Sequence, residues 1–134
     1  MFVTGFVCSM SLSGPCLNKV ITPAGPVIVP MINVSMSCVG TPNILNIYIG
    51  GLLAQNVLTL STSSAGSEVS APSGGGVVSQ AFCSLARATL GSFKFYQAGA
   101  PAKRFLDPTG QNGLLPNSYG LTITMGIFNK MVMT

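Results

Sequence analysis

The apolar residues of this chain fall into short runs separated by Pro, Gly and small polar residues. Residues 22–37, TPAGPVIVPMINVSMS, contain Pro23, Pro26 and Pro30. Each Pro removes an amide donor and fixes its own φ, so these spacings exclude a helix. The apolar residues of the segment partly alternate with other residues, which predicts an edge strand or an irregular strand.

A hairpin is predicted where two apolar runs flank a pair of glycines. Residues 44–49 and 52–60 are β-branched or Leu-rich, and Gly50-Gly51 between them accepts the φ > 0 that a tight hairpin turn requires. Residues 44–60 are also the best candidate for a membrane span, but polar residues and the Gly pair interrupt them. The run is also shorter than the roughly 20 apolar residues that a spanning helix needs. The pattern therefore favours a hairpin.

The remaining segments give predictions of different strength. Period-two alternation predicts strands over residues 92–96 and 120–128. Residues 77–87 fit either a short strand or a helical turn, and the pattern leaves this open. Residues 61–76, STSSAGSEVSAPSGGG, have the composition of a flexible linker. Because the segments on either side are too short for separate domains, we expect a packed loop within one domain.

An internal repeat indicates a multi-lobed β unit rather than a sandwich. A shift of 48 positions brings together four identical pairs: Tyr48 with Tyr96, Gly51 with Gly99, Ala54 with Ala102 and Leu58 with Leu106. An aromatic residue, a glycine and an alanine at this spacing are what a repeated strand–turn–strand module would need.

Composition adds a second constraint. The chain has 134 residues, of which 6% are charged, against about 25% in ordinary soluble domains. This length suits a single domain over residues 1–134. The net charge of +4 comes from six scattered cations, so no basic stripe predicts nucleic-acid binding. Residues 20–67 carry no charge, and we expect a partner to cover part of this surface.

The side chains of acid–base catalysis are nearly missing from the sequence. It contains no His, and its two acids are Glu68 and Asp107. General acid–base catalysis draws mainly on His, Asp, Glu and Lys, so we do not expect an enzyme. A Ser/Lys or Cys enzyme is the least favoured alternative, because no Ser lies in a G-x-S-x-G element.

The four cysteines do not follow the spacing of a zinc ribbon or finger. Buried free thiols are the default expectation, and a Cys8–Cys16 disulfide is the alternative if the protein reaches an oxidising compartment. The N-terminal residues lack the positive charge that opens a secretory signal peptide, so none is predicted.

Residues 99–113, GAPAKRFLDPTGQNG, resemble the P-A-A-R-x-x-D-x-T-x-H signature of PAAR and PAAR-like proteins. We call them the motif segment. The shared positions are Pro101, Ala102, Arg104, Asp107 and Thr109, whereas Lys103 replaces an Ala and Gln111 replaces the His. Residues 22–37 are similar to the T-P-x-G-P-x-P-x-P-x-x-N opening of the PAAR-like branch, and Gly74, Gly75 and Gly76 begin its G-G-G-V-V-S element. In this order the three elements cover about residues 20–113.

The resemblance implies a small, conical, all-β domain with a pseudo-threefold arrangement. Such domains cap a trimeric VgrG-type spike in a contractile injection system, such as type VI secretion or a phage tail, and aid effector delivery and membrane puncture. The expected partners are therefore the spike, an effector and, briefly, the target membrane. The expected location is the bacterial cytoplasm during assembly and the injected spike afterwards. A small β adaptor that holds an effector without joining the spike is the alternative.

The resemblance also suggests roles for single residues. Many relatives bind zinc near the point through His and Cys, but this chain has no His, so we expect no cofactor and no metal at the usual site. A site made from three or four of the Cys is the alternative, and we expect hydrophobic and polar packing in its place. We expect Arg104 and Asp107 to form a turn-stabilising pair, and Gln111 and Asn112 either to cross-link loops or to lie exposed. Residues predicted to shape structural turns are Pro23, Gly25, Pro26, Pro30, Gly74, Gly75 and Gly76.

Overall fold

The computed structural model describes residues 2–5, 8–125 and 131, and these form an all-β fold of antiparallel strands. The predicted fold class is confirmed. Eight strands form one sheet in the order β3-β6-β8-β11-β12-β1-β2-β7. Their bounds are β1 Met10–Thr22, β2 Gly25–Met36, β3 Gly40–Thr41, β6 Leu60–Ser61, β7 Ser64–Ala65, β8 Ala86–Ala88, β11 Pro108–Gln111 and β12 Ser118–Thr122.

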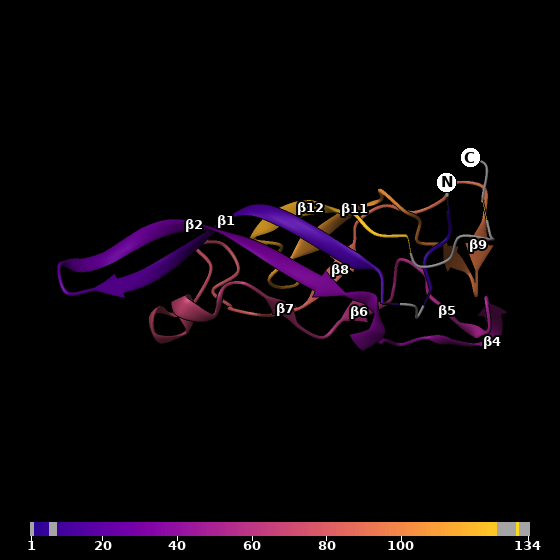
Figure 1. Ribbon diagram of the computed structural model, residues 1–134, viewed down its shortest axis with the longest axis horizontal. Coiled ribbons are helices and arrows are strands. Elements are labelled where there is room, and N and C mark those ends of the chain that lie inside the picture. Colours follow the sequence, from indigo (N-terminus) through magenta and orange to yellow (C-terminus); the bar gives the residue numbers. More distant parts are fainter. Residues whose placement is uncertain (1, 6–7, 126–130, 132–134) are drawn as a thin grey trace.

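Two separate hairpins and two short 3-10 helices complete the described fold. The hairpins are β4 (Ile44–Ile49) with β5 (Leu52–Ala54), and β9 (Tyr96–Gln97) with β10 (Ala100–Pro101). The helices are η1 (Ser37–Val39) and η2 (Glu68–Ser73). Figure 1 shows an elongated molecule in which β4, β5 and β9 lie at one end. The long hairpin of β1 and β2 extends to the opposite end, which we call the hairpin end.

The hairpin end is built by the Pro- and Gly-containing turn that the sequence predicts. β1 and β2 pair from Met10↔Met36 to Thr22↔Gly25, so Pro23 lies in the two-residue turn. The Thr22 hydroxyl donates to the Gly25 carbonyl at 2.7 Å, and Gly25 has φ +121°, a value that L residues rarely adopt. Sequence analysis did not predict β1, in which a bulge interrupts the pairing between Ser13 and Cys16.

Two of the predicted turn prolines lie inside a strand. Pro26 pairs with Ile21 and Pro30 pairs with Leu17, both within β2, so their assignment to turns was wrong. β7 pairs with β2 at Val34 and Ser35. Among the described residues, the Pro-containing part of β2 therefore pairs with β1 on one side and with no strand on the other. Such an edge tolerates a residue that lacks an amide donor.

The repeated hairpin modules are confirmed in register. Tyr48 pairs with Leu53 in the first hairpin, and Tyr96 pairs with Pro101, 48 positions later, in the second. Gly50 and Gly51 have φ of +63° and +83°, and the equivalent Ala98 and Gly99 have +49° and +80°. Both turns thus use two left-handed residues, the type I′ pattern that matches strand twist. The second strand of the first hairpin ends at Ala54, earlier than predicted.

Other sequence predictions need correction. Residues 92–95 are not a strand, because the Ser92 hydroxyl accepts hydrogen bonds from the amides of Lys94 and Phe95 and so forms a local turn. The strand predicted over residues 120–128 is β12, which begins at Ser118 and ends at Thr122; residues 126–128 lie outside the described residues. Residues 77–85 form turns and bends before β8.

The Ser- and Gly-rich segment is packed, as predicted, and contains β7 and η2. Ser61, Ser64, Ser67 and Ser70 are buried along it. The Glu68 carboxylate accepts the Gly66 amide at 2.9 Å, which lowers the pKa of this carboxyl group below its ordinary value. Glu68 thus acts as a local hydrogen-bond acceptor.

The interior consists mainly of small and polar side chains. Buried apolar residues are chiefly Ala. Hydroxyl pairs join β1 to β12, Ser11 with Thr122 and Ser13 with Ser118, and a third pair joins Ser9, just before β1, to Ser37 in η1. Many large apolar side chains are exposed instead. The high apolar content therefore lies largely on the surface, where it favours contact with a partner.

The cysteine expectations are only partly met. Cys8 is bonded to Cys38, with their Cα atoms 4.6 Å apart, so the Cys8–Cys16 pairing was wrong. Cys16 is a buried free thiol, as the default expectation held, and Cys83 is a half-buried one. Among the described residues, none of the helices has the length and apolar content required to cross a bilayer.

Candidate functional site

Three short segments close into a ring at the end that carries the two hairpins. Residues 3–5, 54–56 and 102–104 are joined by the antiparallel bridges Gly5↔Ala54, Asn56↔Ala102 and Arg104↔Val3. In each segment the first residue pairs with one neighbour and the third residue with the other. The three segments are thus equivalent positions of a closed, pseudo-threefold arrangement, which we call the ring.

Each segment of the ring directly follows a residue that is paired with another part of the chain. In the two hairpins these pairs are Tyr48↔Leu53 and Tyr96↔Pro101. The equivalent pair in the third position is Phe2↔Met131, which joins the two ends of the described chain. We call each segment together with its pair an arm of the ring, so the third arm is assembled from residues far apart in sequence.

The arms of the ring expose large apolar side chains. Tyr48 and Tyr96, equivalent by the 48-residue shift, are 66% and 58% exposed, and Met131 in the third arm is 60% exposed. Leu45 and Phe93, a second equivalent pair, are 71% and 70% exposed. We call these five residues the base patch. Exposed large apolar side chains at equivalent positions of a pseudo-threefold arrangement are suited to bind a partner with threefold symmetry.

The motif segment supplies one side of the ring and fastens it to the sheet. The Arg104 guanidinium and the Asp107 carboxylate form a buried ion pair at 3.0 Å, and the same carboxylate accepts the Arg104 backbone amide at 2.7 Å. The guanidinium also donates to the Gly91 carbonyl. Pro101 and Ala102 carry the bridges to Tyr96 and Asn56, and Thr109 is buried in β11. The predicted Arg104–Asp107 pair is therefore present, and it stabilises the turn next to the ring.

The middle residues of the three ring segments are polar and buried. They are Thr4, Gln55 and Lys103, with at most 6% of their surface exposed. Burial disfavours the charged ammonium and lowers the pKa of Lys103 to about 8, although the charge of Asp107 opposes part of this shift. The departure of this residue from the PAAR signature thus places a buried titratable amine on one segment of the ring.

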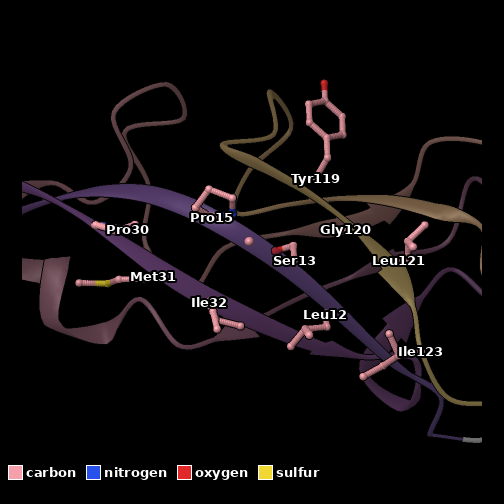
Figure 2. A pocket seen from close by; sticks show the side chains of 11 residues that line it. Leu12, Ser13, Pro15, Pro30, Met31, Ile32, Tyr119, Gly120, Leu121 and Ile123 are labelled. Carbon is pink, nitrogen blue, oxygen red and sulfur yellow. The ribbon is translucent and has the colours of Figure 1, made fainter.

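An open groove lies over β1, β2 and β12 of the sheet. It has a volume of about 770 Å³, and apolar side chains of β1, β2 and β12 line it. Figure 2 shows Leu12, Ile32, Leu121 and Ile123 around the groove, with the Tyr119 ring at its border. Most of the lining side chains are apolar, and the polar ones are the hydroxyl residues Ser13 and Tyr119. The groove is therefore suited to bind an apolar surface.

A cluster of four Asn side chains surrounds the buried thiol of Cys16 at the root of the hairpin end. The Nδ2 groups of Asn117, Asn33 and Asn112 lie 2.9, 3.4 and 3.6 Å from the Cys16 sulfur. The thiol faces Asn18 Oδ1 at 3.8 Å. We call these five residues the thiol–amide cluster.

The two amide residues at the end of the motif segment cross-link other elements. Gln111 is fully buried and donates to the Ser11 carbonyl at 3.1 Å. Asn112 donates to Asn18 Oδ1 at 3.3 Å and accepts the Ser84 amide at 3.3 Å. Of the two alternatives left open by sequence, cross-linking is therefore correct.

The glycine element packs against this cluster. Gly74 ends η2 in the left-handed conformation, and Gly76 pairs with Asn18. A Cβ atom on Gly75, where φ is +82°, would overlap the backbone of Ala81. Glycines at these positions thus allow the chain to turn closely against the hairpin root.

The donor set of the cluster does not fit the zinc ion that the resemblance implies. Among the described residues there is no group of three or more His, Cys, Asp or Glu side chains that could hold a metal. Zinc in proteins takes thiolate, imidazole and carboxylate ligands, whereas the cluster points amide N–H groups at one sulfur.

The chain matches the model of a known protein family. The model of the family described as Toxin PAAR-like domain matches residues 10–117. The chain belongs to this PAAR-like family. The match begins before residue 20 and ends after residue 113, so it is longer than the resemblance seen in the sequence. It includes the long hairpin, the glycine element and the motif segment. Comparison with curated proteins and with solved structures gives no significant match.

Sequence reasoning found part of this site in the PAAR-like domain. It identified the motif segment and two arms of the ring, through the 48-residue repeat. It missed the third arm, because Phe2 and Met131 share no local pattern. It also missed Asn18, Asn33 and Asn117, because single Asn residues far apart in sequence form no pattern that connects them with Cys16.

Proposed function

We propose that this PAAR-like chain is a structural, non-enzymatic tip protein that caps a trimeric VgrG-type spike in a contractile injection system. The observation that carries the proposal is the ring, in which three bridges close three equivalent segments. Membership of the PAAR-like family supports the same assignment.

Symmetry explains why this ring suits such a partner. A single chain placed on the axis of a trimer has to offer a similar surface to each of three identical chains. The base patch offers equivalent aromatic side chains, Tyr48 and Tyr96, on two arms and Met131 on the third. Large, amphipathic aromatic side chains commonly dominate binding energy at interfaces.

The hairpin end suits the leading position on the spike. Residues 20–67 carry no charge, and this interval includes the turn between β1 and β2. A point without charges avoids much of the desolvation cost of contact with lipid. On this proposal the chain assembles on the spike in the bacterial cytoplasm, leaves with it, aids effector delivery and meets the target membrane briefly.

An effector-holding adaptor is the second candidate, and the apolar groove of β1, β2 and β12 is the observation that favours it. The two functions use different surfaces. The tip function depends on the base patch, whereas the adaptor function depends on the groove and its border residue Tyr119.

The test compares variants of the two surfaces in capture of the purified spike trimer. A Tyr48→Ala/Tyr96→Ala variant should bind the trimer at least about tenfold more weakly, because one buried aromatic contact contributes on the order of 2 kcal/mol. Tyr119→Ala is the matched control, since this ring is 64% exposed in the groove. Loss of spike binding in Tyr119→Ala with retention in the double variant would contradict docking through the base.

A further inference from the structure

The thiol–amide cluster lies where four segments meet at the root of the long hairpin. Cys16 and Asn18 come from β1, and Asn33 from β2; Asn112 and Asn117 lie on either side of the loop that follows β11. The glycine element completes the junction, since the Lys19 amide donates to the Gly75 carbonyl at 2.9 Å. The cluster therefore joins the hairpin to the body of the molecule.

Hydrogen bonds outside the cluster fix the orientation of two of its amides. Asn117 Oδ1 accepts the Val78 amide at 2.9 Å, and Asn112 Oδ1 accepts the Ser84 amide at 3.3 Å. A flipped amide at either position would place an NH₂ group against a backbone N–H. The Nδ2 groups of both residues consequently face the Cys16 sulfur.

This orientation opposes the binding of a cation. The sulfur accepts from amide N–H groups, whose hydrogens carry partial positive charge, and its own proton faces Asn18 Oδ1. A metal ion needs thiolate and ligand lone pairs directed at the same point. To create such a site, the amides would have to turn and break their bonds to the Val78 and Ser84 amides.

We propose that the thiol–amide cluster takes the place of a metal ion and fastens the hairpin end by hydrogen bonds alone. Cys16, Asn18, Asn33 and Asn112 have no exposed surface, and hydrogen bonds between buried groups hold their partners without competition from water. The fold of this PAAR-like domain is therefore independent of zinc.

The first test is made on the unmodified protein, purified without chelators. Elemental analysis should find well below one zinc per chain, and neither EDTA nor added zinc chloride should shift the thermal unfolding midpoint. Stoichiometric zinc whose removal by EDTA lowers the midpoint would overturn the proposal.

The second test asks whether the cluster fastens the hairpin. Asn117→Ala removes donors to the Cys16 sulfur and the Leu17 carbonyl, and should speed hydrogen exchange at the Lys19 and Val77 amides about tenfold. The Thr122 amide, which bonds to Asp107 in the body, should exchange at its original rate. Asn46→Ala, at an exposed position of β4, is the control. Equal acceleration at all sites, or none at the hairpin root, would overturn the role.

The third test rebuilds a metal site. In an Asn18→His/Asn33→His/Asn112→His variant, three imidazoles surround Cys16, and zinc should raise the unfolding midpoint by at least about 5 °C. A folded variant whose unfolding midpoint does not rise when zinc is added would show that the cluster does not occupy a metal position. If the variant does not fold, the zinc content of the unmodified protein decides the proposal.

Discussion

The buried Lys103 amine makes the stability of the ring depend on pH. Its pKa is about 8 in the folded protein and 10.5 in an exposed lysine. Below pH 8 the ammonium is charged in both states, and the folded state carries the full cost of burying it. Above pH 8 the folded state loses the proton first, so the free energy of unfolding rises until the pH passes 10.5.

The size of this effect follows from the shift. Each pKa unit corresponds to about 1.4 kcal/mol, so the unfolding free energy should rise by about 2 kcal/mol between pH 7 and pH 9.5 through this group alone. Lys103→Met keeps most of the side-chain volume and removes the titration. At pH 7 it should be more stable than the unmodified protein, and this advantage should shrink as pH rises.

Urea unfolding at pH 7 and pH 9.5 measures the effect as a difference between proteins, in which the other titrating groups cancel. Lys94→Met is the matched control, because it makes the same substitution at an exposed lysine. The same pH dependence in Lys103→Met and in the unmodified protein would refute the reasoning. So would a loss of stability in Lys103→Met at pH 7.

Three further predictions concern stability and are measured by chemical unfolding. Asp107→Asn removes one partner of the buried pair with Arg104 and should cost about 3–5 kcal/mol, whereas a cost below 1 kcal/mol would show that the pair is solvated. Reduction of the Cys8–Cys38 disulfide, which spans 30 residues, should cost about 3–4 kcal/mol, and an unchanged unfolding midpoint would contradict a native bond. Gly75→Ala should destabilise the protein by more than Gly74→Ala, because both have positive φ but only the first Cβ meets neighbouring backbone. Equal losses of stability in the two variants would contradict the inference that a Cβ atom on Gly75 overlaps neighbouring backbone.

Local patterns predicted the parts of the fold that local chemistry determines. Gly50-Gly51 and its flanking apolar runs predicted the β4–β5 hairpin, because left-handed turn residues and strand residues are adjacent in sequence. The motif segment predicted the Arg104–Asp107 pair for the same reason. Alternation failed at Phe93 and Phe95, where the Ser92 hydroxyl binds the following amides and turns the chain.

Long-range features were beyond sequence reasoning. β1 was missed because Gly14 and Pro15 interrupt its alternation, and pairing with β2 and β12 determines its structure. The spacing of the cysteines could not show that Cys8 pairs with Cys38. The repeat revealed two arms of the ring, but the third arm joins residues from opposite ends of the chain.

The central claim is that one pseudo-threefold chain caps one threefold spike. Native mass spectrometry of the chain mixed in excess with the purified VgrG-type spike trimer tests it most directly. The account predicts a single complex of one chain and three spike subunits, with no further copies bound at higher excess. Three chains per trimer, or no complex at any ratio, would contradict it.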